Sequence, residues 1–347
     1  MLTDLTRARY DEFANVVRSR RGRWLILTHD NPDPDSLASA AGLAKILRRG
    51  FRHQVTIAYG GIIGRAENQE MVKTLGLRLS HVRHLNWKNY RNIALVDAQP
   101  GTGNNQLDNI LPHLVFDHHP MRRATQKVRF ADIRTDYGAT ATMIAEYVSA
   151  VGHELNKREA TAFVYAIRSE TQDFGREYSV ADKQLFEELL PQVDNRALAR
   201  IQTPRLPLSY FRNLHEALGS LQSVGSLVVA HLRHVDQPDI VPEIADLLLR
   251  LEGKTWSLCT GIFEERIYAS LRTTNARADA GRLMRRILGR RGKGGGHGMM
   301  AGGWLDCGNG GPDCLEDLQN ALARKLAKTL KKNPDRLLPI PLEPSDP

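Results

Sequence analysis

Four short apolar runs alternate with amphipathic helical patterns between about residue 24 and residue 175. The runs are WLILT (24–28), QVTIAY (54–59), IALVD (93–97) and HLVFD (113–117). Strands that are apolar at nearly every residue are typical of a sheet with both faces covered, and helices between such strands favour parallel pairing. The pattern therefore predicts an α/β domain built on a mostly parallel sheet with helices on both faces.

The rest of the chain predicts a second, smaller domain. A length of 347 residues suits two domains that each bury a core of their own. Apolar runs at 224–232, 256–263 and 266–273, a helix near 241–251 and a hairpin turn at Glu264–Glu265 predict an α+β fold. The predicted segments are a first domain at 1–190, a helical linker at 191–220, a second domain at 221–332 and a proline-rich, disordered tail at 333–347.

The composition favours a soluble protein with anionic partners. The formal net charge of +9 favours phosphate-rich partners without identifying one. Aromatic residues make up only 6% of the chain, which weakens a stacking platform for long single strands. Three cysteines without disulfide spacing indicate a reducing, cytoplasmic location, and no stretch approaches the ~20 apolar residues of a membrane span.

Acidic and histidine residues directly follow three of the apolar runs. WLILT continues into HDNPDPD (29–35), IALV ends in Asp97, and HLVF ends in Asp117, His118 and His119. The carboxyl ends of parallel strands meet at one edge of a sheet, where active sites gather. We therefore expect the side chains of these three clusters to converge on one site.

The gathered carboxylates point to metal ions. Several carboxylates in one cleft repel each other unless cations are bound. Imidazole from His29 and His118, combined with carboxylates such as Asp33, favours Mn²⁺, Co²⁺ or Zn²⁺ over Ca²⁺. HDNPDPD alone is also the composition of an ordinary polar turn, but two adjacent histidines after a buried strand rarely serve packing. The three clusters together predict two divalent ions, with Mn²⁺ favoured.

These motifs resemble those of the DHH phosphoesterase family. HDNPDPDS (29–36), Asp97 after its strand and the D-H-H sequence resemble the first three family motifs, and AIRSETQDF (166–174) resembles the fourth. The metal ligands that the resemblance implies are His29, Asp33, Asp35, Asp97, His118 and Glu170, with Asp35 as the bridging carboxylate. It also implies catalytic roles for His119, which would face the substrate phosphate, and for Asp117, which would orient an imidazole.

The fourth motif departs from the family at one position. The family usually has aspartate where this chain has Glu170, whose extra methylene moves the carboxylate by about one bond length. Asp173, one helical turn further on, is the competing ligand. Glu170 is the favoured ligand of the two.

The second domain resembles the DHH-associated substrate domain through SLRT (270–273) and GGGH (294–297). The substrate contacts that this resemblance implies are Arg272, Gly295, Gly296 and His297, in a cleft between the domains. The glycine-rich run 289–303 is interpreted as a loop whose backbone N–H groups approach phosphate. A flexible turn before a strand at 301–305 is the alternative.

The resemblance is closest to the compact type that acts as nano-RNase and adenosine 3′,5′-bisphosphate phosphatase. It implies hydrolysis of short RNA or DNA oligonucleotides, dinucleotides or 3′,5′-bisphosphorylated nucleotides by a hydroxide that two metal ions activate. The alternative from another class is a non-catalytic nucleotide-binding protein with a decayed metal centre. A pyrophosphatase and a RecJ-like exonuclease are alternatives of the same superfamily. No membrane partner is expected. Formation of a homodimer is compatible with the sequence.

Overall fold

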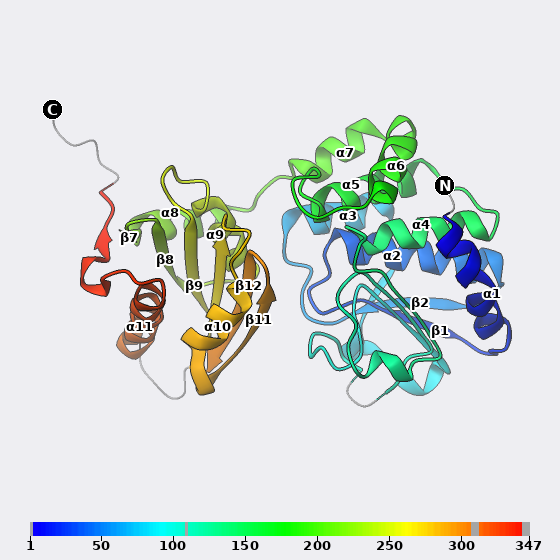
Figure 1. The fold of residues 1–347 in the computed structure, drawn as a ribbon, viewed down its shortest axis with the longest axis horizontal. Coiled ribbons are helices and arrows are strands. Elements are labelled where there is room, and N and C mark those ends of the chain that lie inside the picture. Colours follow the sequence, from blue (N-terminus) through cyan, green and yellow to red (C-terminus); the bar gives the residue numbers. More distant parts are fainter. Residues whose placement is uncertain (1–2, 108–109, 307–311, 342–347) are drawn as a thin grey trace. The chain divides into compact units, whose positions relative to one another are not determined.

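The computed structural model describes residues 3–107, 110–306 and 312–341. The chain divides into two compact units, Met1–Pro204 and Arg205–Pro347 (Figure 1). Each unit has hydrophobic cores of its own. Among the described residues, no helix combines the length and the apolar character that crossing a membrane requires.

The first unit contains a six-stranded sheet in which every pairing is parallel, as predicted. The strands lie in the order β3-β2-β1-β4-β5-β6. Their bounds are β1 Trp24–Leu27, β2 Val55–Tyr59, β3 Leu79–His81, β4 Asn92–Val96, β5 Leu114–Asp117 and β6 Phe130–Ile133. The chain adds β2 and β3 on one side of β1 and then returns to add β4 on the other side. Such a reversal makes the carboxyl ends of β1 and β4 the usual place for a ligand site.

Alternate residues of the strands enter two different cores. Trp24 and Ile26 of β1 contribute to the core that the α-helices of the unit join, whereas Leu25 and Leu27 contribute to a core on the opposite face. The sequence predicted helices on both faces. In the described structure the α-helices lie against one face, because residues 82–89 beside the other face form only single 3₁₀ turns and loops.

Capping residues define where several helices of the first unit begin. Asp33 caps α2, and Asn156 and Ser179 form capping boxes at α5 and α6. The helices are α1 Asp4–Arg18, α2 Pro34–Lys45, α3 Ala66–Leu75, α4 Thr140–Ala150, α5 Lys157–Glu170, α6 Val180–Leu189 and α7 Asn195–Gln202. A π-helical turn, η1 Ile46–Gly50, follows α2, and the 3₁₀ turns are η2 Val82–His84, η3 Trp87–Asn89, η4 Thr125–Lys127 and η5 Leu190–Gln192.

The predicted linker at 191–220 is helical but is divided between the two units. Helix α7 packs on α3 and α5, and its Leu198 and Ile201 enter the core of the first unit. Helix α8, Leu208–Gly219, packs on β8 of the second unit. Because each helix buries apolar side chains within its own unit, only residues 203–207 connect them.

The second unit contains a mixed sheet in the order β11-β12-β10-β9-β8-β7-β13, as expected for an α+β domain. The β8–β9 pair is parallel and the other pairs are antiparallel. The strands are β7 Gln222–Val224, β8 Leu227–His234, β9 Trp256–Phe263, β10 Arg266–Thr273, β11 Gly292–His297, β12 Met300–Asp306 and β13 Leu338–Pro339. The predicted hairpin at Glu264–Glu265 is confirmed, with Phe263 opposite Arg266.

Helices cover both faces of this second sheet. One core includes residues of α8 and of α9, Ile240–Leu248. The other includes residues of α10, Ala280–Leu288, and of α11, Pro312–Thr329.

The prediction of a disordered tail at 333–347 is wrong for residues 334–339. Pro334–Arg336 forms a 3₁₀ turn, and β13 pairs with β7 at the sheet edge. Arg324 of α11 pairs with Asp335 at 2.6 Å. Prolines are tolerated here because an edge strand does not need every backbone N–H for pairing. Residues 342–347 lie outside the described part of the chain.

Candidate metal centre

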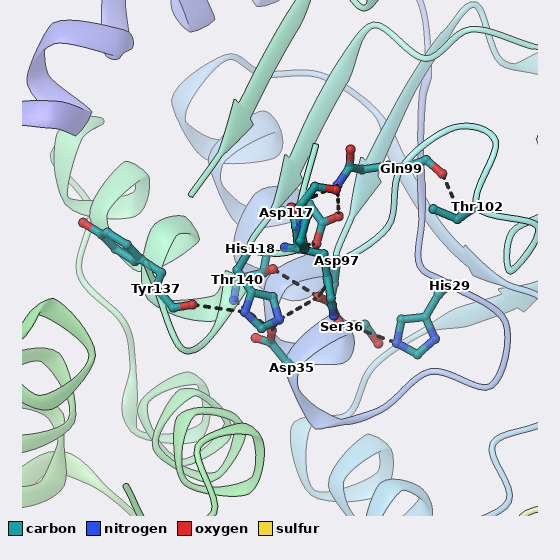
Figure 2. Close-up of polar contacts among 12 residues, drawn as sticks. His29, Asp35, Ser36, Asp97, Gln99, Thr102, Asp117, His118, Tyr137 and Thr140 are labelled. Carbon is teal, nitrogen blue, oxygen red and sulfur yellow. Dashed lines mark hydrogen bonds and ion pairs between the residues drawn. The ribbon is translucent and has the colours of Figure 1, made fainter. Parts of the chain in front are cut away.

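The acidic and histidine clusters predicted from the sequence meet at the carboxyl edge of the parallel sheet. His29 follows β1, Asp97 follows β4, and Asp117 ends β5. Figure 2 shows these side chains near Asp35 of α2 and Thr140 of α4. The strand ends therefore position His29, Asp97 and Asp117, and the N-termini of α2 and α4 supply Asp35 and Thr140.

The proline-containing loop after β1 brings Asp33 to the site. Pro34 lies in the first turn of α2, and the Asp33 side chain caps this helix by accepting from the Ser36 amide at 2.9 Å. The other oxygen of Asp33, Oδ2, lies 3.5 Å from Nε2 of His29. Nδ1 of His29 lies 2.8 Å from the carbonyl oxygen of Asp30, which orients the ring with Nε2 toward the carboxylates.

Asp97 lies at the centre of the cluster. Its Oδ2 is 3.5 Å from Nε2 of His29, and its Oδ1 is 3.7 Å from Nε2 of His118. Asp97 is 4% exposed, and its left-handed backbone (φ 54°) is of the strained kind found at functional sites. Two groups of described residues are compact enough to hold a metal ion: His29, Asp33 and Asp97, and Asp97, His118 and His119.

The resemblance implied Asp35 as the bridging carboxylate, whereas among the described residues Asp97 is the member common to both compact groups. The backbone N–H of Thr140 donates to Oδ2 of Asp35 at 2.8 Å, and that of Ala141 donates to Oδ1 at 2.7 Å. Both donors belong to the first turn of α4, whose dipole favours a carboxylate. Oδ2 of Asp35 lies 4.0 Å from Nε2 of His118, so Asp35 approaches the second group from one side.

His118 presents a buried nitrogen to the cluster. Its Nδ1 lies 3.1 Å from the carbonyl oxygen of Tyr137, so in the neutral ring Nδ1–H donates and Nε2 carries the lone pair. Nε2 is shielded from solvent and has no hydrogen-bond partner. Such a buried acceptor is costly unless a ligand uses it. A metal ion fits, because neutral imidazole is a common metal ligand and carboxylates surround the position.

Asp117 and Gln99 hold the second histidine of the D-H-H sequence. Oδ1 of Asp117 lies 2.8 Å from Nδ1 of His119 and also accepts the backbone N–H of His119. Gln99 donates to Oδ2 of Asp117 at 2.7 Å. This geometry suits the orienting role predicted for Asp117. The sequence did not reveal Gln99, because one glutamine two residues after Asp97 forms no recognisable spacing.

Glu170, and not Asp173, lies next to the cluster. Glu170 is the last residue of α5 and interacts electrostatically with Asp33 and Asp97. Asp173 forms an ion pair with Arg168, and its side chain is 66% exposed. Residues 172–174 have left-handed backbones, so Asp173 is not on the next turn of the helix. The geometry therefore favours Glu170 as the ligand from the fourth motif.

Burial and mutual repulsion raise the pKa of two carboxylates of the site, Asp35 and Glu170. Burial and the neighbouring Asp97 and Glu170 hold the pKa of Asp35 well above its usual range. Burial, Asp33 and Asp97 raise the pKa of Glu170 to about 7. Burial lowers the pKa of His118, but the charges of Asp97 and Glu170 outweigh it and raise that pKa. A bound cation would relieve this repulsion, and mixed nitrogen and oxygen donors suit a divalent transition ion.

The predicted substrate residues of the second unit lie on adjoining strands. The register places Arg272 of β10 and His297 of β11 on either side of Met300 of β12. Arg272 is 9% exposed, and its Nε donates to Asp246 of α9 at 2.6 Å. The side chain of His297 lies outside the described part of the structure.

The glycine-rich run was predicted as a loop, and much of it is strand β11. The glycines allow α10 to pack directly on this strand. A Cβ added at Gly281 of α10 would lie 2.1 Å from the carbonyl oxygen of Gly296, and one at Gly294 would lie 2.6 Å from Leu288. Gly295 differs, because a Cβ there would have no atom within 4 Å. Its open face keeps the predicted phosphate contact at Gly295 sterically feasible.

Two residues that position the start of α4 were also missed. Thr140 donates through Oγ1 to Oδ1 of Asp97 at 3.1 Å. Asp182 of α6 is fully buried and accepts from the Gly138 amide at 2.7 Å and from the Thr142 hydroxyl at 2.5 Å. These contacts join residues 40 to 44 positions apart, so no local spacing reveals them.

The fold and the site together define an α/β domain with a candidate metal centre, followed by a mixed-sheet domain. Residues 23–167 match the DHH family, N-terminal domain, and residues 225–328 match the DHHA1 domain. The chain therefore belongs to the DHH family and carries a DHHA1 domain after its DHH domain. This confirms the family that the sequence motifs resemble.

Two individual proteins are also similar to this chain. An uncharacterized protein of Methanocaldococcus jannaschii is 34% identical over 281 residues, which are 80% of this chain and 57% of that protein. The chain thus spans little more than half the length of that relative. The crystal structure of an exopolyphosphatase-related protein from Bacteroides fragilis has a TM-score of 0.68 at 16% identity, covering 95% of this chain and 100% of that chain. That likeness shows a shared fold.

Proposed function

We propose that this chain is a metal-dependent phosphoesterase that hydrolyses short oligonucleotides, dinucleotides or 3′,5′-bisphosphorylated nucleotides. The observation that carries the proposal is the buried cluster around Asp97, whose two oxygens face separate groups of ligand atoms. The proposed ligands are His29, Asp33 and Asp97 for one divalent ion, and Asp97, His118, Asp35 and Glu170 for the other. Divalent ions such as Mn²⁺ would stabilise the negative charge on the phosphate oxygens and lower the pKa of water.

The chain's own residues would bind and orient the phosphate. Asp117 holds His119 through Nδ1, so the Nε2 side of the ring is placed to exchange a proton with a phosphate oxygen. Gln99 fixes Asp117 in turn. In the second unit, the proposed substrate contacts are Arg272, Gly295, Gly296 and His297, with Asp246 fixing the guanidinium of Arg272.

Membership of the DHH family and the positive net charge support an anionic phosphate substrate. A complete set of candidate ligands favours catalysis over the alternative of a non-catalytic nucleotide-binding protein. Release of phosphate or mononucleotide with Mn²⁺ tests the proposal. The substrates are a linear dinucleotide, a five-nucleotide RNA, adenosine 3′,5′-bisphosphate, cyclic dinucleotides and pyrophosphate.

We expect Mn²⁺-dependent turnover of the short nucleotides, abolished by Asp97→Asn. Asp173→Asn, which also removes one carboxylate near the site, is the matched control and should retain turnover. Turnover of pyrophosphate alone would favour the pyrophosphatase alternative. Nucleotide binding without any turnover would contradict the phosphoesterase proposal.

A further inference from the structure

A second charged surface lies at the opposite edge of the parallel sheet. Exposed arginines surround the amino-terminal ends of β1, β2 and β4, whereas the metal cluster lies at the carboxyl ends. We call this surface the arginine edge and define it as Arg18, Arg21, Arg23, Arg49, Arg52 and Arg91. From Arg23 to His29 the chain runs along β1 for six residues, so the two sites are about 20 Å apart.

Backbone contacts bring the three arginine-bearing segments together. The amide of Trp24 donates to the carbonyl of Gln54, and the amide of Asn92 donates to the carbonyl of Arg23. The side chain of Arg91 lies 3.3 Å from the position of a Cβ on Gly22. Across the other junction, the Arg18 guanidinium lies 5.8 Å from the ring centre of Phe51. The six arginines therefore lie on neighbouring segments at one edge of the sheet.

Acidic residues do not neutralise this surface. In the part of the chain that the structure describes, none of the six arginines takes part in an ion pair. The sequence stretches 13–29, 36–66 and 71–96, which carry them, contain no aspartate or glutamate. Residues 13–131 hold eighteen Lys and Arg against eight Asp and Glu, whereas the rest of the chain holds 30 against 31. The net positive charge of the protein is thus concentrated in this region.

The positive charge at this edge also lowers the pKa of two neighbouring groups, Arg48 and His113. Burial and the nearby charge of Arg78 lower the pKa of Arg48, which adjoins Arg49. Burial and the charges of Arg20 and Arg129 lower the pKa of His113, which precedes β5 at the same edge. Holding so many cations together without counter-charges is unfavourable, and a bound polyanion would relieve the repulsion.

We propose that the arginine edge binds the sugar-phosphate backbone of a nucleic-acid strand, away from the metal centre. Guanidinium groups suit phosphodiesters because they donate two parallel hydrogen bonds to one phosphate, and all six residues are arginine. The segments offer few aromatic side chains for base stacking, so we infer recognition of the backbone without sequence preference. This binding site does not depend on the proposed hydrolysis, since it involves none of the candidate metal ligands.

The test is fluorescence anisotropy with a labelled single-stranded RNA of ~20 nucleotides, in chelator, between about 50 and 300 mM salt. The variant carries Arg21→Gln, Arg23→Gln, Arg49→Gln and Arg52→Gln. The matched control removes four exposed cations elsewhere, through Lys183→Gln, Arg196→Gln, Arg233→Gln and Arg250→Gln. Circular dichroism verifies the fold of both, and the double variant Arg21→Gln, Arg23→Gln replaces the fourfold variant if that one unfolds.

For the arginine-edge variant we expect affinity to fall at least about tenfold at 100 mM salt, and the salt slope of log K to shrink by about 0.7 for each lost phosphate contact. The control should stay within about twofold of wild type, and hydrolysis of a dinucleotide should not change in either variant. An equal loss of RNA affinity in the arginine-edge variant and in the control would overturn the proposal. An arginine-edge variant that binds RNA as tightly as the wild type would overturn it as well. Binding to anionic lipid vesicles without binding to RNA would also overturn it.

Discussion

Glu170 carries one methylene more than the aspartate that the resemblance led us to expect at this position. It is the last residue of helix α5. The following residues leave the helix through three left-handed backbones, which turn Asp173 toward Arg168. The sequence spacing placed these two carboxylates in competition, because it assumed a continuing helix. The actual end of α5 separates them.

Removing the charge of Glu170 should weaken metal binding far more than removing that of Asp173. For Glu170→Gln we expect Mn²⁺ affinity to fall by more than the roughly 10- to 100-fold that loss of an outer partner costs. Asp173→Asn should leave the Mn²⁺ affinity within about twofold of the wild-type value, because the Asp173 carboxylate is exposed and already paired with Arg168. Calorimetric titration with Mn²⁺ measures both. The reverse ranking would transfer the ligand role to Asp173.

His231 of β8 predicts a pH dependence of stability that is independent of the metal site. Burial lowers its pKa to about 4, and its Nδ1 lies 2.7 Å from Oγ1 of Thr260. Because the folded-state pKa lies below the ordinary value of about 6.5, the unfolded state binds the additional proton first. The stabilisation of the neutral ring is therefore complete above about pH 6.5 and is lost as the pH falls toward 4.

At pH 5 this linkage should cost the second unit about 2 kcal/mol relative to pH 7.5. Hydrogen exchange of the β8 and β9 amides, corrected for intrinsic rates, measures that loss. In His231→Gln, which has no titrating ring, the difference should largely disappear. Equal protection of the wild-type amides at both pH values would contradict the prediction.

At the scale of elements, the sequence predicted those strands whose residues are nearly all apolar. It missed β3, whose three residues are only half-buried. It also assigned β11 to a loop, because glycine favours turns, while pairing with β12 and packing under α10 determine the actual conformation. The candidate site was likewise predicted only in part. Ligands at strand ends were predictable, whereas Gln99, Thr140 and Asp182 act through contacts distant in sequence.

Alanine substitutions of two glycines, Gly281 in α10 and Gly295 in β11, should differ in their effect on stability. Gly281→Ala should destabilise the second unit by about 1–3 kcal/mol, because its Cβ would collide with the backbone of Gly296. Gly295→Ala should leave stability nearly unchanged, because its Cβ would meet no atom. Urea unfolding followed by far-UV circular dichroism compares them. If Gly295 contacts substrate, its variant should raise KM; a tolerant Gly281→Ala would show that α10 and β11 do not pack this closely.

Asp182 holds the start of α4, which in turn supplies the two N–H donors of Asp35. Asp182→Ala leaves the Gly138 amide and the Thr142 hydroxyl without their buried acceptor, which should cost about 3 kcal/mol of unfolding free energy. Mn²⁺ affinity should fall as well, because Asp35 loses its support. Glu187→Gln on the exposed side of α6 is the control. Unchanged Mn²⁺ affinity in a destabilised Asp182→Ala protein would show that α4 does not position Asp35.

At the scale of the whole molecule, the candidate metal ligands and the arginine edge all belong to the first unit. The two ends of its strands carry opposite charge: carboxylates gather at the carboxyl ends and unpaired cations at the amino ends. The parallel sheet makes this separation possible, because it presents all strand ends of one kind at one edge. The sequence located the acidic edge by its motifs, while the basic edge became visible only once segments 18–23, 49–52 and 91 were placed together.

Because the first unit has its own cores and all six candidate ligands, residues 1–204 should fold and bind Mn²⁺ without the second unit. We expect the Mn²⁺ affinity of this fragment to lie within about tenfold of that of the full chain. Glu170→Gln in the fragment should weaken binding as it does in the full chain. Circular dichroism and calorimetric titration measure folding and affinity. A folded fragment that no longer binds Mn²⁺ would mean that the second unit contributes to the metal centre, and the ligand assignment around Asp97 would then be incomplete.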